Sequence, residues 1–154
     1  MQLRQIDWAN VDQITALSVQ ASQRSFVVSN KDSLVDAYVA TSLGGAAKPF
    51  GLYECGYPVG FVMIGYDTLG DEDEPNIAKK NYCLWRFMID QRYQRKGLGR
   101  MAMKKILEYL RAKPLGPAEY CWTSYEPENQ VAKALYESFG FIENGELCGE
   151  EIVA

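Results

Sequence analysis

The sequence contains no histidine. This absence excludes Ser-His and Cys-His nucleophile systems, histidine-ligated zinc and histidine general bases, so any acid–base chemistry must use other side chains. The four cysteines are far apart and form no CxxC pair, which indicates buried free thiols rather than disulfides or a metal site. No apolar run is as long as a membrane span, and the first residues lack the pattern of a signal peptide. We therefore expect a cytoplasmic protein with no metal and no membrane partner.

The chain has 154 residues, 47% of them apolar, and we expect one domain over residues 1–154. It carries 16 basic and 20 acidic residues, but the charge is unevenly distributed. The acidic total argues against nucleic acid as a partner. Between Gln91 and Leu107 there is no acid, and the basic residues there are Arg92, Arg95, Lys96, Arg100, Lys104 and Lys105. This basic segment predicts an anionic ligand.

Hydrophobic periodicity and turn residues predict alternating strands and helices. Asn10 is expected to cap a first helix, and a second helix follows Asn30 with Leu34, Val35, Tyr38 and Val39 at helical spacing. Later helices are predicted from Leu98 to Lys113 and from Pro127 to Gly140. The predicted strands cover 1–6, 49–55, 58–67, 81–90 and 118–125, with a tight turn at Gly56-Tyr57 and a closing hairpin around Asn144-Gly145. This order predicts an α/β fold with a mixed sheet and helices on both faces.

The segment "QRKGLGR", residues 94–100, follows an apolar strand and opens a helix. A helix N-terminus has unpaired N–H groups and the positive end of a dipole, and glycines at 97 and 99 allow an oxyanion to approach the backbone. A pyrophosphate fits this description. A Walker A loop is absent, and "GLGRMA" matches a dinucleotide fingerprint only formally. Its glycines follow the strand too late, and Glu119 begins the next strand instead of ending it.

Two motifs together resemble the GCN5-related N-acetyltransferase family. "FMIDQRYQRKGLGRMAM" contains an apolar strand followed by Q/R-x-x-G-x-G/A, and "ENQVAKALYESFGF" is similar to the family's N-x-x-A-x-x-x-Y-x-x-x-G-F helix. The resemblance covers nearly the whole chain. It implies a central mixed, mostly antiparallel sheet of six to seven strands, with about four helices on both faces.

The resemblance also implies binding of acetyl-CoA as a co-substrate. The backbone of β-strand residues 87–89 would pair with the pantetheine arm, and the amides of 94–100 would hold the pyrophosphate. Asn129 would hydrogen-bond the arm, and Lys133 lies a turn further on. The residues so assigned are Phe87, Met88, Ile89, Gln94, Arg95, Lys96, Gly97, Leu98, Gly99, Arg100, Asn129 and Lys133.

Acetyl transfer to an amine needs two proton movements, because the ammonium must lose a proton and the departing thiolate gains one. The family pattern places Tyr136 as the proton donor. The sequence leaves the general base open between Glu126, Asp67 and Glu54. Cys83 and Cys121 have no base identified beside them, so direct transfer from the cofactor to the amine is favoured over an acyl-cysteine.

Within the family, the "RFMID" strand followed by "YQRKGLG" resembles the bacterial spermine/spermidine (diamine) acetyltransferase branch, which implies a polyamine acceptor. The acidic run "GDEDE" at Gly70 to Glu74 would attract a polycation. Trp85 is a candidate substrate contact, together with Glu126 and Asp67, and the other strand aromatics Tyr82, Trp122 and Tyr125 either line a slot or pack the core. Arg95 departs from the branch, because many relatives carry glycine there. Another amine acceptor, a non-catalytic acetyl-CoA sensor and a homodimer remain open.

Overall fold

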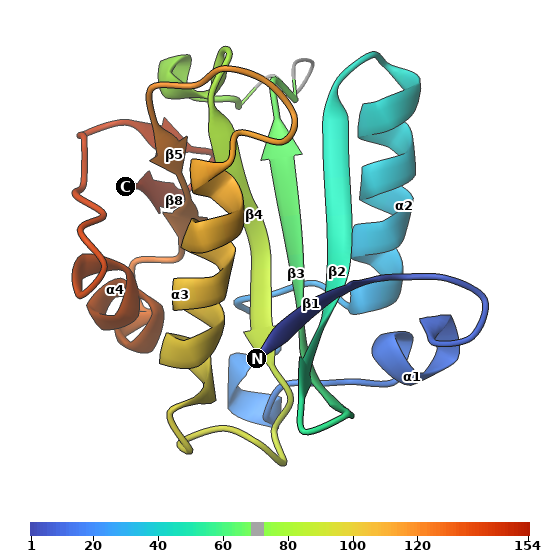
Figure 1. The fold of residues 1–154 in the computed structure, drawn as a ribbon. Coiled ribbons are helices and arrows are strands. Elements are labelled where there is room, and N and C mark those ends of the chain that lie inside the picture. Colours follow the sequence, from blue (N-terminus) through green and yellow to red (C-terminus); the bar gives the residue numbers. More distant parts are fainter. Residues whose placement is uncertain (69–72) are drawn as a thin grey trace.

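The computed structural model describes residues 1–68 and 73–154, which form strands flanked by helices (Figure 1). Single 3-10 turns cover Ala21–Gln23 and Asn76–Ala78. The other elements are β1 (Gln2–Gln5), α1 (Val11–Thr15), α2 (Asn30–Ser42), β2 (Ala46–Glu54), β3 (Tyr57–Tyr66), β4 (Tyr82–Ile89), α3 (Leu98–Arg111), β5 (Cys121–Trp122), β6 (Ser124–Tyr125), α4 (Gln130–Glu137), β7 (Leu147–Cys148) and β8 (Glu151–Val153).

The strands form a five-stranded sheet in the order β1-β2-β3-β4-β5 and a three-stranded sheet in the order β6-β8-β7. All pairs are antiparallel except β4 with β5, which are parallel. The mixed α/β fold is therefore confirmed, although the strands are divided between two sheets instead of forming one sheet of six or seven. The division occurs at Thr123, where the predicted strand 118–125 leaves β4 and pairs with the C-terminal strand, exchanging backbone hydrogen bonds with Ala154.

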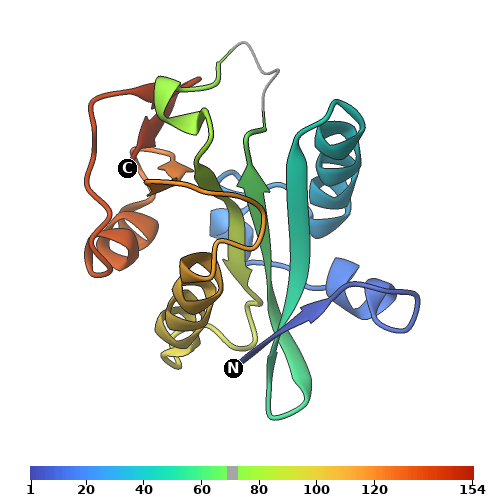
Figure 2. The same cartoon turned by 45° about the horizontal axis from the view of Figure 1, so that its top comes forward.

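Helices cover both faces of the larger sheet, with α3 and α4 on one side and α1 and α2 on the other (Figures 1 and 2). The first core packs α3 against apolar residues of β2, β3 and β4. Its helical contribution is Ala102, Met103, Ile106 and Leu110, at the three- and four-residue spacing of one helix face. The second core joins α1 and α2 to the opposite sheet face around Ile14, Phe61 and Met63. Within the described residues, no helix is both long enough and apolar enough to cross a membrane.

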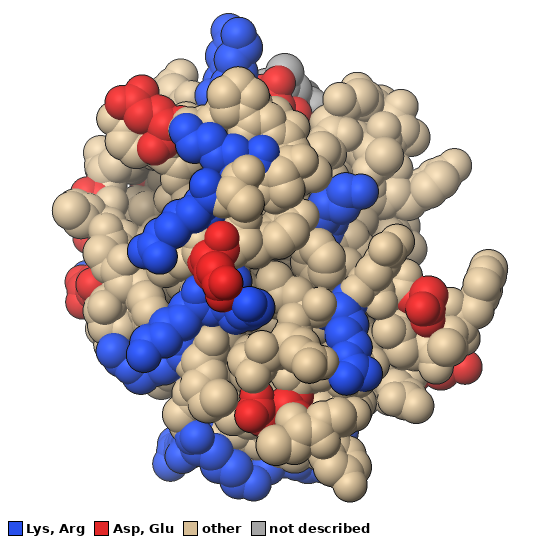
Figure 3. Space-filling view, viewed as in Figure 1, with Lys and Arg blue, Asp and Glu red and all other residues tan. Residues whose placement is uncertain are grey.

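The exposed face of α3 carries basic side chains. Lys104 and Arg111 are exposed, whereas the apolar residues on the other side of the same helix are buried. Figure 3 shows blue side chains along this face and around the lower end of the molecule, interspersed with acidic ones. The basic segment seen in the sequence is thus partly a solvated helix face, and of its basic residues only Arg95 lines the cavity described below.

Helix α2 buries small and polar residues more than the apolar residues that its sequence places at helical spacing, of which Leu34 is partly buried. Asn30, Ser33 and Ala37 are buried, whereas Val35 and Tyr38 are exposed. The small side chains allow the helix to lie against β2, and the buried Asn30 amide donates a hydrogen bond to the Ile14 carbonyl at 2.8 Å. A buried polar group with a partner costs little, so burial here does not follow hydrophobicity.

Several predicted turns and caps are displaced by a few residues. The β2–β3 turn is centred on Cys55-Gly56, both with positive φ, instead of Gly56-Tyr57. The closing hairpin joins β7 to β8 through residues 149–150 instead of turning at Asn144-Gly145. Asn10 stands at the N-cap of α1 but its Oδ1 accepts from the Asp7 N–H instead, at 3.0 Å. Helix α2 begins at Asn30 itself, capped by Ser29, and α4 begins at Gln130 instead of Pro127.

Candidate active site

A cavity of about 460 Å³ opens where β4 separates from the strand beside it. Strand β4 pairs with β5 only at Tyr82 and Cys83, and the Thr123 hydroxyl makes the next link by donating to the Leu84 carbonyl at 3.0 Å. Beyond this point one wall consists of residues 84–89 and the facing wall of residues 123–126. The backbone edge of β4 on this side is therefore available to an extended ligand.

Strand β4 contains a β-bulge at Trp85. The register with β3 shifts between Met63, opposite Arg86, and Ile64, opposite Leu84, which leaves Trp85 without a partner. A bulge bends the strand and changes the direction of its side chain. Trp85 lines the cavity together with Arg86, whose guanidinium lies 5.4 Å from the centroid of the Trp85 ring and 3.4 Å from an Asp36 oxygen.

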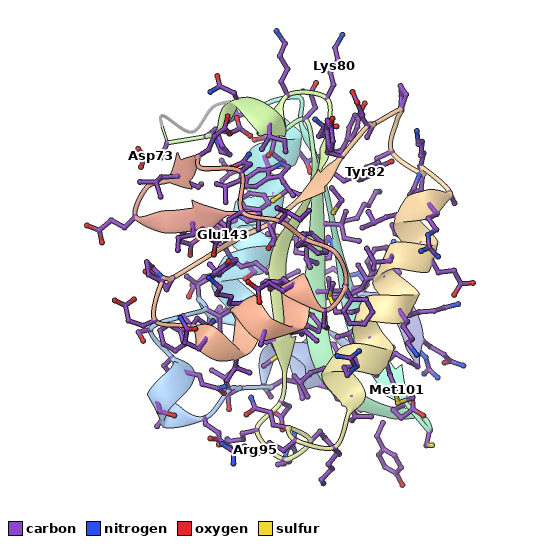
Figure 4. All side chains as sticks on the ribbon, turned by 90° about the vertical axis from the view of Figure 1, so that its left-hand side faces the viewer. Asp73, Lys80, Tyr82, Arg95, Met101 and Glu143 are labelled. Atoms are coloured by element: carbon purple, nitrogen blue, oxygen red, sulfur yellow. The ribbon has the colours of Figure 1, made fainter. Side chains whose placement is uncertain are left out.

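The loop before α3 supplies the lower wall of the cavity, where Figure 4 labels Arg95. Gln94, Arg95 and Gly99 line the cavity. Within the described residues, none of the backbone N–H groups from position 94 to position 100 donates a hydrogen bond. Helix α3 also has no side-chain cap, because Gly97 stands at its N-cap with φ of 76°. A row of unpaired amides at the positive end of a helix dipole is a site for an oxyanion.

Several side chains at the start of α3 and in the loop before it form hydrogen bonds with other parts of the protein. The Gln94 amide donates to the Ile89 carbonyl at 2.9 Å, which ties the loop to the end of β4. Lys96 donates to the Arg92 carbonyl, and Arg100 donates to the Ser138 hydroxyl. Lys96, Gly97, Leu98 and Arg100 do not line the cavity. Arg95 has φ of 58°, which explains why glycine suits this position and why arginine here stores backbone strain.

The carboxylate of Asp90 anchors the start of this loop. It is buried and accepts hydrogen bonds from the N–H of Ser18, the N–H of Arg92 and the Arg92 guanidinium, at 3.0, 3.0 and 2.7 Å. Burial alone would raise the pKa of Asp90, but the hydrogen bonds from Arg92 and Ser18 outweigh it and lower the pKa.

Replacing Asp90 by Asn should lower the free energy of unfolding by about 1–3 kcal/mol at pH 7, because hydrogen bonds to a charged acceptor are lost. A lowered native pKa stabilises the fold above the unfolded aspartate pKa of about 3.9, and this contribution disappears as the pH falls through the native value. The difference between Asp90→Asn and wild type should thus be constant near neutrality and shrink below about pH 4. Urea denaturation at pH 7 and pH 3 measures it, with the exposed Glu128→Gln as control. A difference that persists undiminished at pH 3 would contradict this assignment.

Tyr136 of α4 lines the same cavity and is buried, with 7% exposure. Its ring packs against Tyr125 and Phe141, at centroid distances of 5.8 and 5.6 Å, and its hydroxyl interacts with the side chain of Thr123. Burial raises the pKa of Tyr136 to about 12, so the phenol keeps its proton at physiological pH. It is a proton donor held inside a cavity.

Helix α4 is fixed by its first residue and by an ion pair. Asn129 lines the cavity and caps α4 by accepting from the Ala132 N–H at 3.2 Å. Lys133 does not line the cavity, because its ammonium contacts Glu143 at 2.7 Å and Glu137 at 3.8 Å. Glu143, labelled in Figure 4, also accepts from the Tyr125 hydroxyl at 2.8 Å. These contacts hold α4, and with it Tyr136, against β6, and they engage the Lys133 ammonium away from any phosphate in the cavity.

The three acids considered as bases from the sequence lie in different places. Glu126 lines the cavity. Asp67 accepts from the Lys80 N–H at 2.8 Å and lies outside the cavity. Glu54 lies at the end of β2, 2.6 Å from the N-terminal ammonium, and is also outside it. Of the acidic run at 70–74, residues 70–72 lie outside the described residues, and Glu74 accepts from the Thr68 hydroxyl.

No disulfide joins the cysteines, all four of which lie in the described part of the chain; Cys83 is buried and Cys55 is exposed. Burial raises the pKa of Cys83 well above its ordinary value and that of Cys121 to about 12. Neither thiol lines the cavity, and a protonated thiol is a weak nucleophile. Both observations argue against an acyl-cysteine.

Sequence reasoning missed two parts of the cavity wall. One is the segment between α1 and α2, which contributes Gln23, Arg24 and Phe26. The other is Ser124 with Glu151, from strands too short to show a pattern. No local signal marks either, because both reach the cavity through the tertiary fold.

Comparison with known proteins agrees with this geometry. The model of the acetyltransferase (GNAT) family matches residues 13–141. The chain is 39% identical over 144 residues to a spermine/spermidine N(1)-acetyltransferase of Bacillus subtilis (strain 168), covering 91% of this chain and 88% of that protein. An aminoglycoside acetyltransferase solved with coenzyme A has the same fold, with a TM-score of 0.73 and 18% identity over 99% of this chain and 93% of the other. A chimeric spermidine N-acetyltransferase from Vibrio cholerae aligns with a TM-score of 0.63 and 20% identity, over 99% and 91%. The chain belongs to the acetyltransferase (GNAT) family.

Proposed function

We propose that this protein transfers the acetyl group of acetyl-CoA directly to a primary amine, and that the physiological acceptor is a polyamine such as spermine or spermidine. The observation that carries the proposal is a single cavity lined both by the loop with unpaired amides before α3 and by the buried, protonated Tyr136. The loop can hold the diphosphate of the cofactor, and the proton donor can protonate the departing thiolate.

The residues present fit the cofactor. The amides of 94–100 would hold its pyrophosphate, and the free edge of β4 at Phe87, Met88 and Ile89 would hold its extended arm. Asn129, which lines the cavity at the start of α4, would contact the arm. The bound thioester supplies the acetyl group. The Ile89 N–H would polarise its carbonyl, and the phenol of Tyr136 donates a proton to the departing thiolate.

Three observations support a polyamine acceptor. The 39% identical relative is named for spermine and spermidine. The carboxylates of Glu126 and Glu151 line the cavity and attract a cationic amine. Trp85 offers an aromatic wall for a methylene chain or an ammonium group. Asp67 is not part of this acceptor site, because it lies outside the cavity.

Incubating the protein with acetyl-CoA and a panel of amines, with thiol release as the readout, tests the proposal. We expect spermine and spermidine to release free thiol well above the rate without amine. Turnover of a peptide N-terminus or an aminoglycoside while both polyamines are idle would reject the polyamine acceptor and leave the acetyltransferase. Tight coenzyme A binding with no turnover of any amine would instead favour a sensor domain.

The match at residues 13–141 and the 91% coverage by the curated relative support one catalytic domain over residues 1–154. We assign this domain to the cytoplasm. A homodimer is compatible with the assignment.

A further inference from the structure

The described residues that line the cavity include two acids, Glu126 and Glu151. The acceptor amine has a pKa near 10 and arrives as an ammonium ion, so a proton must leave before nitrogen can attack. A general base must lie within hydrogen-bond reach of that proton or reach it through one water. Since Glu54 and Asp67 are outside the cavity, the base is to be sought among the acids that line it.

Glu151 has a fixed position on the cavity wall. It is the first residue of β8, and the Ser124 hydroxyl donates a short hydrogen bond to its Oε2. Ser124 follows Thr123, whose side chain contacts the hydroxyl of Tyr136. The pairing of β6 with β8 therefore fixes the carboxylate of Glu151 beside the strand whose preceding residue, Thr123, contacts Tyr136 of α4.

Glu151 and Tyr136 line the same cavity, and the charge of Glu151 adds to the effect of burial in raising the pKa of Tyr136. Glu126 is the other acid that lines the cavity. Its backbone carbonyl accepts from the Asn129 N–H at 2.8 Å, which places it at the turn into α4, nearer the assigned cofactor contact.

Building on the acetyltransferase function proposed above, we propose that Glu151, positioned by Ser124, is the general base that deprotonates the acceptor ammonium. The ammonium proton passes to the Glu151 carboxylate, directly or through one water, and from there to solvent. The free amine then forms the C–N bond, the C–S bond breaks with its electron pair leaving on sulfur, and the Tyr136 proton passes to the thiolate. After the attack the nitrogen still carries two protons. One of them passes to the Tyr136 phenolate and restores the phenol, so one turnover releases one proton to solvent.

Other ionisable groups face the same region and must be considered in a pH experiment. Tyr136 projects from α4, Tyr125 and Glu126 from β6 and its end, and Cys148 pairs with Glu151 from β7. Arg86 lines the wall formed by β4. The test therefore compares variants of one enzyme across pH instead of assigning a single titration.

The test measures kcat/KM from pH 6 to pH 10 for wild type, Glu151→Gln and Glu151→Asp. The probe is spermidine, or the amine of the panel that wild type acetylates fastest. Glu151→Gln should lose about 10²–10⁴-fold at pH 7, and the deficit should narrow towards pH 10 as solvent supplies the free amine. Glu151→Asp should keep part of the activity and the wild-type pH profile. Acetyl-CoA affinity should stay within a few-fold in both.

Glu150→Gln, the same change at the exposed neighbouring position, is the matched control for loss of one charge. The inference is overturned if Glu151→Gln stays within a few-fold of wild type at pH 7, or is reduced by one factor at every pH. It is also overturned if Glu126→Gln shows the pH-dependent loss instead. A wild type that acetylates no amine would reject the acetyltransferase proposal itself, whereas an active wild type with an unimpaired Glu151→Gln rejects only the base.

Discussion

Replacing Tyr136 by Phe should lower kcat by about 10²–10⁴-fold, the range typical of a lost general acid, while acetyl-CoA still binds. The change removes one oxygen from a side chain that is 93% buried between Tyr125 and Phe141, and it leaves the ring contacts in place. Stopped assays of thiol release give kcat, and calorimetric titration gives cofactor affinity. Because loss of a proton donor acts on the transition state, KM should change far less than kcat.

Tyr120→Phe is the matched control, since Tyr120 is 53% exposed and lies outside the cavity. The pKa of Tyr136, raised by burial to about 12, adds a second check. Its phenol should remain protonated through pH 10, so wild-type kcat should not fall from ionisation of this group between pH 7 and pH 10. Full activity of Tyr136→Phe would remove Tyr136 from the mechanism and transfer the donor role to solvent or another group.

The elements that build the cofactor side of the site could be predicted from the sequence because local rules specify them. The apolar run at β4, the glycines at 97 and 99, and the amphipathic faces of α3 and α4 each have a short-range physical cause. The predicted strand at 81–90 and helix at 98–113 agree with the structure to within two residues at each end.

The acceptor side could not be predicted in the same way. Glu151 and Ser124 meet only because the chain changes sheets at Thr123, and strands of two or three residues have no readable periodicity. The error on α2 has a different cause. Small residues and a hydrogen-bonded Asn30 occupy the buried face, so of the four apolar residues at helical spacing Leu34 alone packs against the core. Both failures are tertiary effects that outweigh local preference.

The lysine on α4 shows how a motif can predict an element but not a contact. Lys133 lies in the expected helix, but its ammonium forms an ion pair with Glu143. Glu143 lies in a loop that carries no motif. The same loop carboxylate holds Tyr125. We therefore expect backbone amides to make most of the contacts with the phosphates. Cofactor affinity should then depend mainly on the backbone conformation of the loop before α3.

A substitution at Gly99 tests whether cofactor binding depends on the backbone of this loop, and it should not disturb the fold. Its φ is not in the left-handed region, and an added Cβ would find only Leu135 Cδ2, at 3.8 Å, an ordinary contact. Alanine is a better helix former than glycine by about 0.5–1 kcal/mol, so Gly99→Ala should fold with an equal or higher melting temperature. A side chain there, however, occupies the space through which an oxyanion must approach the amides.

Gly99→Val should therefore weaken acetyl-CoA binding by about 10-fold to 100-fold, the equivalent of about 1–3 kcal/mol of steric conflict, at nearly unchanged stability. Met101→Val is the matched control, because Met101 lies in the same turn of α3, is 41% exposed and points away from the cavity (Figure 4). Calorimetric titration with acetyl-CoA and thermal unfolding separate binding from folding. If Gly99→Val binds acetyl-CoA as wild type does, the start of α3 does not hold the pyrophosphate, since no ligand could reach those amides past a valine.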